Sequence, residues 1–383
     1  MIRSGSDPER GPSGDAPHDL ATIGVVGAGV MGAGIAQLAL EAGHEVVLHD
    51  LDAEALARGR TRIEDGLSRR ARNVVADSSE TGAWVRERLD RLRVTDVLEQ
   101  VADEADVVLE AAIESLELKR TIFGILDSVA SPETILATNT SALSVGAIAA
   151  AAARSGRVLG LHFFNPAPVM RLVEVVAGPE TTDDVVARAS SLVSSWGRTP
   201  VRSTDTPGFI VNRVNRPFTL EALRMIEDGS ASVEQVDQAL RAAGYPLGPF
   251  ELMDLTGIDV TFAAASAIWQ GLGRPDRLRP SPIQEVLIGQ GDLGRKSGQG
   301  FYRYPVDGQI AVSERFASDP GLAAATAITM RIETAIRAEA QLAAAAGVAS
   351  PSDIDLALRL GAGHPRGPFS RAEGPDPSAS EPE

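Results

Sequence analysis

Histidine is the side chain best suited to act as a general base near neutral pH, and the chain has five. One of them, His162, closes the apolar, β-branched run 158–162, which predicts a strand. Open α/β sheets bind ligands at the carboxyl ends of their strands, so His162 is the candidate base. Of the other histidines, His18 lies in the N-terminal segment, and His44 and His49 flank a second predicted strand. His364 lies in a repeated segment.

A glycine-rich loop near the N-terminus predicts a second site. Gly27-Ala-Gly29-Val-Met-Gly32 follows a predicted strand and opens a predicted helix. Gly27 permits a tight turn, Gly29 lets the backbone approach a pyrophosphate, and Gly32 lets the helix pack closely on the strand. Asp50 ends the next predicted strand, where a carboxylate accepts hydrogen bonds from the ribose hydroxyls and repels a 2′-phosphate. The loop therefore predicts an NAD site, the alternative being a structural turn without a ligand.

Predicted strands that alternate with helical patterns must position His162 and the glycine-rich loop. This alternation predicts an α/β fold with a Rossmann-type, doubly wound and mostly parallel sheet. Beyond residue 205 the strand-like runs give way to amphipathic helical patterns, which predict an all-α C-terminal domain. The predicted strands cover 21–27, 45–50, 105–109, 134–137, 158–162 and 172–176.

The helical half contains an internal repeat. Residues 232–241 (SVEQVDQALR) match 350–359 (SPSDIDLALR), and the turn 246–250 (PLGPF) matches 365–369 (PRGPF). Chance similarity between alanine-rich helices is the alternative, although Pro, Gly and Phe all coincide at the turn. We therefore predict two related helical units.

The repeat completes the predicted domain organisation, with a disordered, Pro- and Ser-containing tail at each end. In this alignment His364 stands where the first copy has Tyr245, which favours a structural role for His364. The predicted parts are an N-terminal tail (1–19), an NAD-binding domain (20–205), a helical substrate and dimerisation domain (206–305), a second helical copy (306–372) and a C-terminal tail (373–383).

Composition excludes several classes of function. The 383-residue chain has no cysteine, which excludes disulfides, thiolate metal sites and cysteine nucleophiles, and no metal site is predicted. A net charge of −16 disfavours nucleic acid as a partner. No apolar run approaches the length needed to cross a membrane, and no targeting signal is recognisable, so we expect a cytoplasmic protein.

Three separated motifs resemble one enzyme family. His162 stands in Leu161-His-Phe-Phe-Asn-Pro-Ala-Pro-Val-Met170, and the chain also has the GAGVMG loop and Pro207-Gly-Phe-Ile-Val-Asn-Arg213. Together they resemble the 3-hydroxyacyl-CoA dehydrogenase family, which includes bacterial 3-hydroxybutyryl-CoA dehydrogenases. The resemblance covers residues 21–304. It implies NAD-dependent oxidation of (S)-3-hydroxyacyl-CoA to 3-oxoacyl-CoA, or the reverse reaction.

The resemblance implies catalytic roles at four matching positions. His162 matches the general base, and Glu174 matches its carboxylate partner, the alternative being an exposed strand acid. Ser141 matches a contact to the substrate hydroxyl, although serine also suits a helix N-cap. Asn212 matches a second polar contact to the substrate, and the alternative is a polar residue at a helix terminus.

The resemblance also implies further cofactor contacts, at Glu114, Lys119, Asn165 and Lys296. Ordinary surface polarity is the alternative for all four. Lys119 and Lys296 are the only lysines in an arginine-rich chain. Because lysine and arginine differ in shape and hydration, their retention at these two matching positions supports the cofactor role.

Two departures from the family pattern leave alternatives open. Where the family usually offers Ser and Lys to CoA phosphates, this chain has Arg69, Arg70 and Arg72, which bind phosphates or form a solvated helix face. The substrate is therefore an acyl-CoA or an acyl group on an acyl carrier protein. The second helical copy has Met330 at the position of Asn212, so it cannot repeat that polar contact. The presence of this second copy predicts either a homodimer or a monomer in which the two copies form an internal pseudo-dimer.

Besides the carrier-protein substrate, two alternative functions remain open. A related β-hydroxyacid or 6-phosphogluconate-type dehydrogenase would use a lysine in place of the pair formed by His162 and Glu174. UDP-sugar dehydrogenases need a cysteine and are excluded. A non-catalytic NAD-binding scaffold would keep Asp50 and the glycines but lose the histidine and glutamate, both of which are present.

Overall fold

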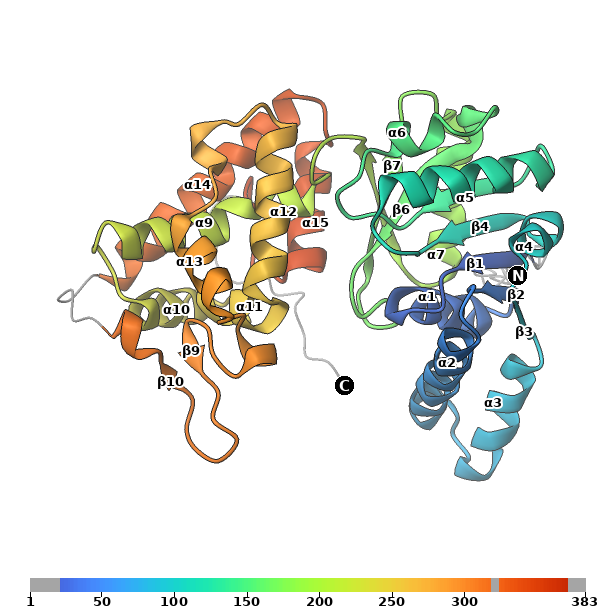
Figure 1. The fold of residues 1–383 in the computed structure, drawn as a ribbon, viewed down its shortest axis with the longest axis horizontal. Helices are drawn as coiled ribbons and strands as arrows, with labels where there is room; N and C mark the ends of the chain where they lie inside the picture. The colour runs from blue at the N-terminus through green and yellow to red at the C-terminus, as the bar shows by residue number, and fades with distance from the viewer. Residues whose placement is uncertain (1–20, 318–323, 371–383) are drawn as a thin grey trace, which may run out of the picture.

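A computed structural model describes residues 21–317 and 324–370. The chain forms two lobes that lie side by side, an N-terminal lobe built on a sheet and a C-terminal lobe built of helices (Figure 1). The two predicted tails, 1–19 and 373–383, lie outside the described residues.

One eight-stranded sheet organises the first lobe, with the order β3-β2-β1-β4-β5-β6-β7-β8. Neighbouring strands are parallel except for the antiparallel pair β6 and β7. This confirms the predicted doubly wound, mostly parallel sheet. The strands are β1 (Thr22–Val26), β2 (Glu45–His49), β3 (Leu92–Thr95), β4 (Val107–Glu110), β5 (Ile135–Thr138), β6 (Val158–Phe163), β7 (Leu172–Ala177) and β8 (Thr199–Thr204).

Helices cover both faces of this sheet. Side chains of α1, α2, α3 and α7 form the hydrophobic core on one face, and those of α4, α5 and α6 form it on the other. Both faces are therefore buried, as parallel sheets require. The helices are α1 (Val30–Glu41), α2 (Ala53–Val74), α3 (Thr81–Leu89), α4 (Leu98–Glu104), α5 (Leu116–Val129), α6 (Val145–Ala149) and α7 (Asp183–Ser195).

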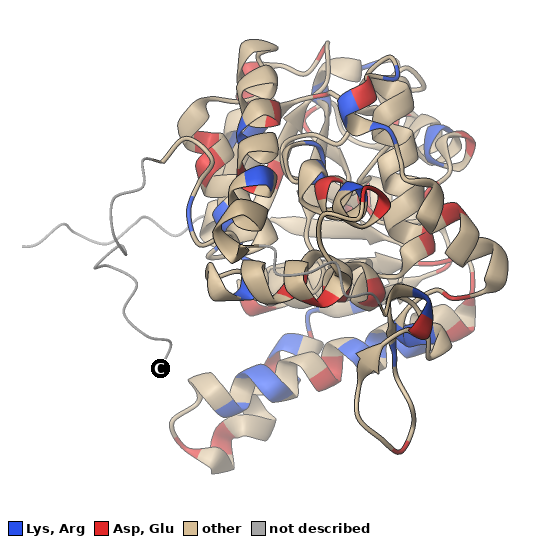
Figure 2. Ribbon diagram, turned by 90° about the vertical axis from the view of Figure 1, so that its left-hand side faces the viewer, with Lys and Arg blue, Asp and Glu red and all other residues tan. Residues whose placement is uncertain are grey.

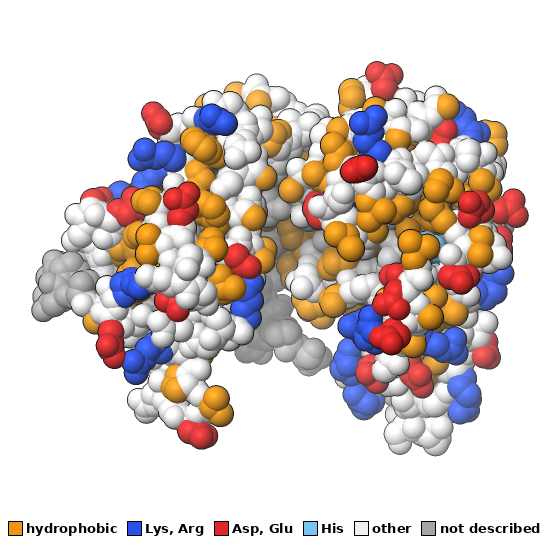
Figure 3. Space-filling view, viewed as in Figure 1, with side chains coloured by type: hydrophobic (Ala, Val, Ile, Leu, Met, Phe, Trp, Pro, Cys, Tyr) orange, Lys and Arg blue, Asp and Glu red, His pale blue; other side chains and the backbone are white. Residues whose placement is uncertain are grey.

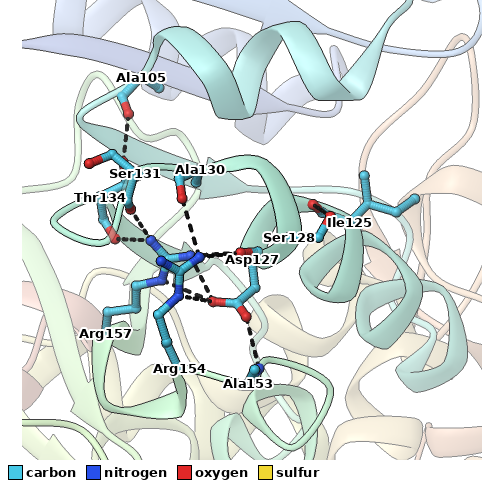
Figure 4. Close-up of polar contacts among 10 residues, drawn as sticks. All are labelled: Ala105, Ile125, Asp127, Ser128, Ala130, Ser131, Thr134, Ala153, Arg154 and Arg157. Carbon is cyan, nitrogen blue, oxygen red and sulfur yellow. Dashed lines mark hydrogen bonds and ion pairs between the residues drawn. The ribbon is translucent and has the colours of Figure 1, made fainter.

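A buried ion pair anchors the start of β6, the strand that ends near His162. Arg157 precedes β6, and its Nη2 lies 2.7 Å from Oδ1 of Asp127 on α5 (Figure 4). The other carboxylate oxygen of Asp127 accepts from the backbone N–H of Ala153 at 2.8 Å, and Arg154 joins the same cluster. Because Arg157 and Asp127 are both buried, the pair fixes the chain where it enters the sheet.

The second lobe is helical, apart from a short hairpin of β9 (Tyr302–Arg303) and β10 (Ala311–Val312). Within the described residues, no single helix is long and apolar enough to cross a membrane, although α11 and α12, which meet at a bend of 102°, reach that length together. The helices are α8 (Val211–Val214), α9 (Arg216–Glu227), α10 (Val233–Ala242), α11 (Pro249–Thr256), α12 (Ile258–Gly271), α13 (Pro282–Gln290), α14 (Ala325–Ala345) and α15 (Pro351–Ala362).

The two copies of the repeat pack against each other with reciprocal contacts. Arg213 pairs with Glu339 of the second copy at 2.8 Å. At the same offset in the repeat, Arg331 pairs with Glu221 of the first copy at 3.2 Å. In a two-fold interface, residue i contacts residue j and j contacts i, so the copies are related by a pseudo-two-fold axis.

The matched residues Tyr245 and His364 lie at this axis, because they contact each other. Their rings meet edge to face, with 5.0 Å between centroids. Nε2 of His364 lies 2.8 Å from Oδ1 of Asn215, and the hydroxyl of Tyr245 lies 3.5 Å from the matched Glu333. The structural role expected of His364 follows from these contacts.

Candidate active site

His162 and Glu174 face each other across an antiparallel strand pair. They are directly opposed in the register of β6 and β7, so their side chains leave the sheet on the same face. Nδ1 of His162 lies 2.6 Å from Oε2 of Glu174, which is 0% exposed. The alternative that Glu174 is an exposed strand acid is therefore wrong. Because an ionised carboxylate only accepts hydrogen bonds, Nδ1 donates and Nε2 is left to accept a proton.

The other oxygen of Glu174 fixes the start of the helical lobe. Its Oε1 accepts from the backbone N–H groups of Ile210 and Val211 at 3.0 and 2.9 Å. The preceding turn has positive φ at Gly208 (79°) and at Phe209 (47°), an unusual conformation for a side chain as large as phenylalanine. This turn aims the two N–H groups at the carboxylate, so Glu174 joins both lobes at the candidate base.

The residues around His162 line a cavity of about 450 Å³ between the lobes. Ser141, from the loop after β5, and Asn212, from α8, both line this cavity, and Nδ2 of Asn212 donates to the backbone oxygen of Ser141 at 3.4 Å. Figure 3 shows the groove between the lobes, with hydrophobic side chains in its depth. The helix-cap alternative for Ser141 is wrong, because Ser144 caps α6 by accepting from the N–H of Ala147.

The glycine-rich loop connects β1 to α1 in the predicted way. Gly27 has φ +102°, and a Cβ on Gly32 would lie 1.8 Å from the backbone oxygen of Gly27, so both positions require glycine. A Cβ on Gly29 would meet nothing within 4 Å, and no side chain caps the N-terminus of α1. Asp50 lies beside the loop, where its Oδ2 accepts from the N–H of Ala28 at 2.9 Å. The open backbone, the uncapped helix and the adjacent carboxylate fit a dinucleotide.

Comparison with protein families agrees with both sites. The family described as 3-hydroxyacyl-CoA dehydrogenase, NAD binding domain, matches residues 22–206. The family described as 3-hydroxyacyl-CoA dehydrogenase, C-terminal domain, matches residues 208–304 and 328–373. The chain belongs to the 3-hydroxyacyl-CoA dehydrogenase family. The resemblance predicted from the three motifs is therefore confirmed.

The relatives of this dehydrogenase include proteins of different length. It is 46% identical over 303 residues to 3-hydroxyadipyl-CoA dehydrogenase from Escherichia coli, which covers 79% of this chain and 62% of that protein. It is 41% identical over 285 residues to the human mitochondrial hydroxyacyl-coenzyme A dehydrogenase, covering 74% of this chain and 90% of the relative. The crystal structure of 3-hydroxybutyryl-CoA dehydrogenase from Escherichia coli superposes with a TM-score of 0.80 at 37% identity, covering 92% of this chain and 91% of that one.

These findings confirm the predicted chemistry at the level of the reaction. The chain is an NAD-dependent oxidoreductase of the 3-hydroxyacyl-CoA dehydrogenase type. The alternative of a non-catalytic NAD-binding scaffold is therefore wrong. The roles of individual residues stay predictions, which the geometry makes more specific.

Two predicted cofactor contacts of the dehydrogenase lie together after β4. Lys119 is only 1% exposed, and its Nζ lies 2.7 Å from Glu110 and 3.3 Å from Glu114. Glu114 also accepts from the hydroxyl of Thr140 and the N–H of Ser141, at 2.6 and 3.1 Å. Surface polarity is therefore the wrong account of Lys119, while its contact with the cofactor stays a prediction. Glu110 was missed, although a carboxylate ending an apolar strand was a usable signal.

The other two predicted contacts lie in different places. Asn165 lines the 450 Å³ cavity beside His162. Lys296 lies in the helical lobe, where its Nζ is 2.5 Å from Oδ1 of Asp259 on α12. Among the described contacts, none joins Lys296 to the glycine-rich loop, and its cofactor role stays a prediction.

Arg216 and Thr219 also line the cavity of the dehydrogenase, and the sequence analysis did not single them out. Arg216 follows Asn212 by four residues, which is the spacing of neighbours on one helix face. That spacing was a usable signal once Asn212 had been chosen. Burial of the arginine, however, depends on how the lobes pack.

Proposed function

We propose that His162 is the general base of the reaction and that Glu174 positions its ring and stabilises its protonated form. The observation that carries this proposal is the 2.6 Å contact between Nδ1 of His162 and a fully buried Glu174 at the cavity wall. With Nδ1 donating to the carboxylate, Nε2 takes the proton of the substrate 3-hydroxyl during oxidation. NAD⁺, when bound, supplies the acceptor for the hydride that leaves C3.

Ser141 and Asn212 are proposed to bind the oxygen on C3. Both line the cavity with His162, and each carries a side-chain donor. A donor aimed at this oxygen stabilises the negative charge that develops there when hydride is transferred to the 3-oxo form. The contact between Asn212 and the backbone of Ser141 keeps the two donors close together.

We infer that CoA, rather than an acyl carrier protein, is the acyl carrier. Arg62 and Arg69 line a second cavity, of about 440 Å³, which also includes Asn165 of the first cavity. They are seven residues apart on α2, along which several arginines lie (Figure 2). Guanidinium groups bind phosphates in a bidentate manner, so this helix face suits the phosphates of CoA. Arg70 instead lies 3.5 Å from Glu41.

We also propose that the protein is a monomer with an internal pseudo-dimer. The second helical copy supplies, in the same chain, the reciprocal contacts that a second subunit would otherwise supply. Its position matching Asn212 is Met330, which is 62% exposed and lies outside the cavity lining. The second copy therefore supports the first copy without forming a second catalytic cavity.

The experiment that tests the function is NADH oxidation by the purified protein with acetoacetyl-CoA. NADPH and acetoacetyl-loaded acyl carrier protein are assayed in parallel. We expect turnover with the CoA thioester and NADH, and much weaker turnover with NADPH because Asp50 repels a 2′-phosphate. Activity confined to the carrier-protein substrate would overturn the assignment of CoA and keep the base. Inactivity with both carriers would contradict the proposed function.

A further inference from the structure

Arg216 is buried without a partner for its charge. Its side chain is 9% exposed, and its Nε is buried without a hydrogen-bond partner within the described part of the chain. No carboxylate of the described residues lies within ion-pair distance of it. Desolvation by burial lowers the pKa of the guanidinium to about 10, and no neighbouring charge opposes that shift. The group is still a cation at neutral pH, so its desolvation cost is not offset within the described structure.

The other buried arginines show how this fold normally holds such a group. Arg157 pairs with Asp127 at 2.7 Å, and Arg213 pairs with Glu339 at 2.8 Å. Arg213 lies three residues before Arg216, in the preceding helix α8. Arg216 therefore differs from both in lacking a counter-ion, although it is about as deeply buried.

The position of Arg216 at a helix N-terminus adds to this cost. It is the first residue of α9, a helix of 12 residues, where the helix dipole disfavours a positive charge. An anion at this place would instead interact favourably with the guanidinium and with the positive end of the helix dipole. The local electrostatics are therefore suited to a bound anion.

The surroundings of Arg216 show what could deliver that anion. Arg216 lines the same 450 Å³ cavity as His162, Ser141 and Asn212. Of the described residues that line it, none is acidic, and Arg216 is the only one other than His162 that can carry a positive charge. Asn212, the proposed contact to C3, lies four residues before Arg216, in the preceding helix α8. A substrate whose reacting carbon lies at His162 would therefore have the guanidinium in the same cavity as its acyl group.

We propose that Arg216 binds a carboxylate at the far end of the acyl group, so that the preferred substrates are 3-hydroxy- and 3-oxoacyl-CoA thioesters of dicarboxylic acids. This inference rests on the proposed function, because it uses His162 to place C3. A guanidinium recognises a carboxylate through two parallel N–H···O bonds. Asn212 and Arg216 line the same cavity and are only four residues apart in the chain, which suits an acyl group with a few methylene groups between C3 and the carboxylate.

Two substrates of equal carbon number test this selectivity. The values of kcat/KM are measured for 3-oxoadipyl-CoA and for 3-oxohexanoyl-CoA, which differ at the far end in a carboxylate against a methyl group. We expect the wild-type protein to prefer the carboxylate by roughly 10–100-fold, the usual value of a charge-assisted hydrogen bond in a buried site. Arg216→Met should bring this ratio close to one, and Arg216→Lys should leave it between the two.

Controls separate this inference from the proposed function. Arg331→Met removes a half-exposed arginine of the helical lobe outside the cavity lining, and should leave the substrate ratio unchanged. Wild-type protein that uses both substrates equally would overturn the carboxylate site and leave the dehydrogenase function intact. An unchanged preference in Arg216→Met would equally overturn the role of Arg216. Inactivity of the wild type with both thioesters would instead overturn the proposed function. If Arg216→Met fails to fold, the ratio of the two kcat/KM values of the wild-type protein still tests the preference for a carboxylate.

Discussion

Glu174 accepts hydrogen bonds from the ring of His162 and from backbone N–H groups of the helical lobe. Its negative charge has a different importance for these two contacts. Oε2 holds the ring of His162, while Oε1 holds the first N–H groups of the helical lobe. A neutral amide has one acceptor oxygen, which could still accept from the two N–H groups, but its NH₂ group would donate to Nδ1 of His162 and would not stabilise an imidazolium. The negative charge of this residue therefore serves the reaction more than the packing.

Replacing Glu174 with Gln tests that separation. We expect kcat to fall by about 10²–10⁴-fold, because the protonated form of His162 loses its counter-ion and the ring loses its preferred tautomer. The measurement is steady-state NADH oxidation with acetoacetyl-CoA, with the thermal unfolding midpoint recorded alongside. A variant that unfolds far below the wild type, yet turns over normally when folded, would show that Glu174 acts on the fold alone.

At the level of elements, the pseudo-two-fold axis between the helical copies holds a histidine that stays neutral. Desolvation by burial lowers the pKa of His364 to about 4. The unfolded chain has the ordinary pKa of about 6.5, so it takes up a proton over the interval from about 6.5 to 4 that the folded chain does not. Stability is therefore lost as the pH falls through this interval.

We expect His364→Gln to reduce this acid sensitivity. Between pH 7 and pH 5 the wild type should lose about 2 kcal/mol more of its free energy of unfolding than the variant, since one pKa unit corresponds to about 1.4 kcal/mol. Denaturant unfolding at the two pH values measures the difference. Glu333 and Arg366, which pair with each other at 2.6 Å beside His364, remain in both proteins. Equal pH dependence of the two proteins would contradict the buried neutral state.

The reciprocal ion pairs between the copies provide a matched test of burial. Glu339 is 1% exposed and leaves the buried Arg213 uncompensated when its charge is removed, so Glu339→Gln should cost about 3–5 kcal/mol. Glu221→Gln removes the matched carboxylate, whose partner Arg331 is 37% exposed, and should cost about 0–1 kcal/mol. The free energies of unfolding of both variants give the comparison. Similar losses would mean that burial does not distinguish the two pairs.

The sequence could predict those elements that carry strong local patterns. Six strands of the sheet have apolar or β-branched runs, and the glycine loop has a spacing tied to its geometry. The two missed strands, β3 and β8, are the edges of the sheet and have exposed, polar alternate residues such as Arg93 and Arg202. These edge strands are stabilised more by hydrogen bonding to the neighbouring strand than by the β-propensity of their own residues. A local sequence pattern does not show which strands pair.

Some residues of the candidate site could likewise be predicted from local motifs, and others could not. His162, Ser141 and Asn212 stand in recognisable motifs, whereas the unpaired state of Arg216 depends on which carboxylates the fold brings near it. The same holds for the burial of Lys119 between Glu110 and Glu114. Neither could be predicted from spacing, because each depends on contacts between separate elements.

At the scale of the whole molecule, the second helical copy connects the first copy with the sheet. α14 packs on α9 and α10, while α15 packs on α8 and on strands β7 and β8. The N–H of Thr204 at the end of β8 donates to the backbone oxygen of Val348 at 3.0 Å. The copy thus supports β7, the strand that carries Glu174, from the side of the helical lobe.

This arrangement predicts a monomer in solution. Light scattering should give a mass near the 40.1 kDa of one chain over a range of concentrations, because the reciprocal contacts are already made within the chain. A mass near twice that value, independent of dilution, would show that the internal pseudo-dimer does not replace a second subunit.

The assignment of His162 as the base is the central claim, and one substitution tests it most directly. His162→Gln is assayed for NADH oxidation with acetoacetyl-CoA, and NADH binding is followed by fluorescence in the same preparation. We predict a fall in kcat of about 10²–10⁴-fold with an unchanged dissociation constant for NADH, because the glycine loop and Asp50 are untouched. Turnover within a few-fold of the wild type, with NADH bound equally well, would remove His162 from the reaction and contradict this account.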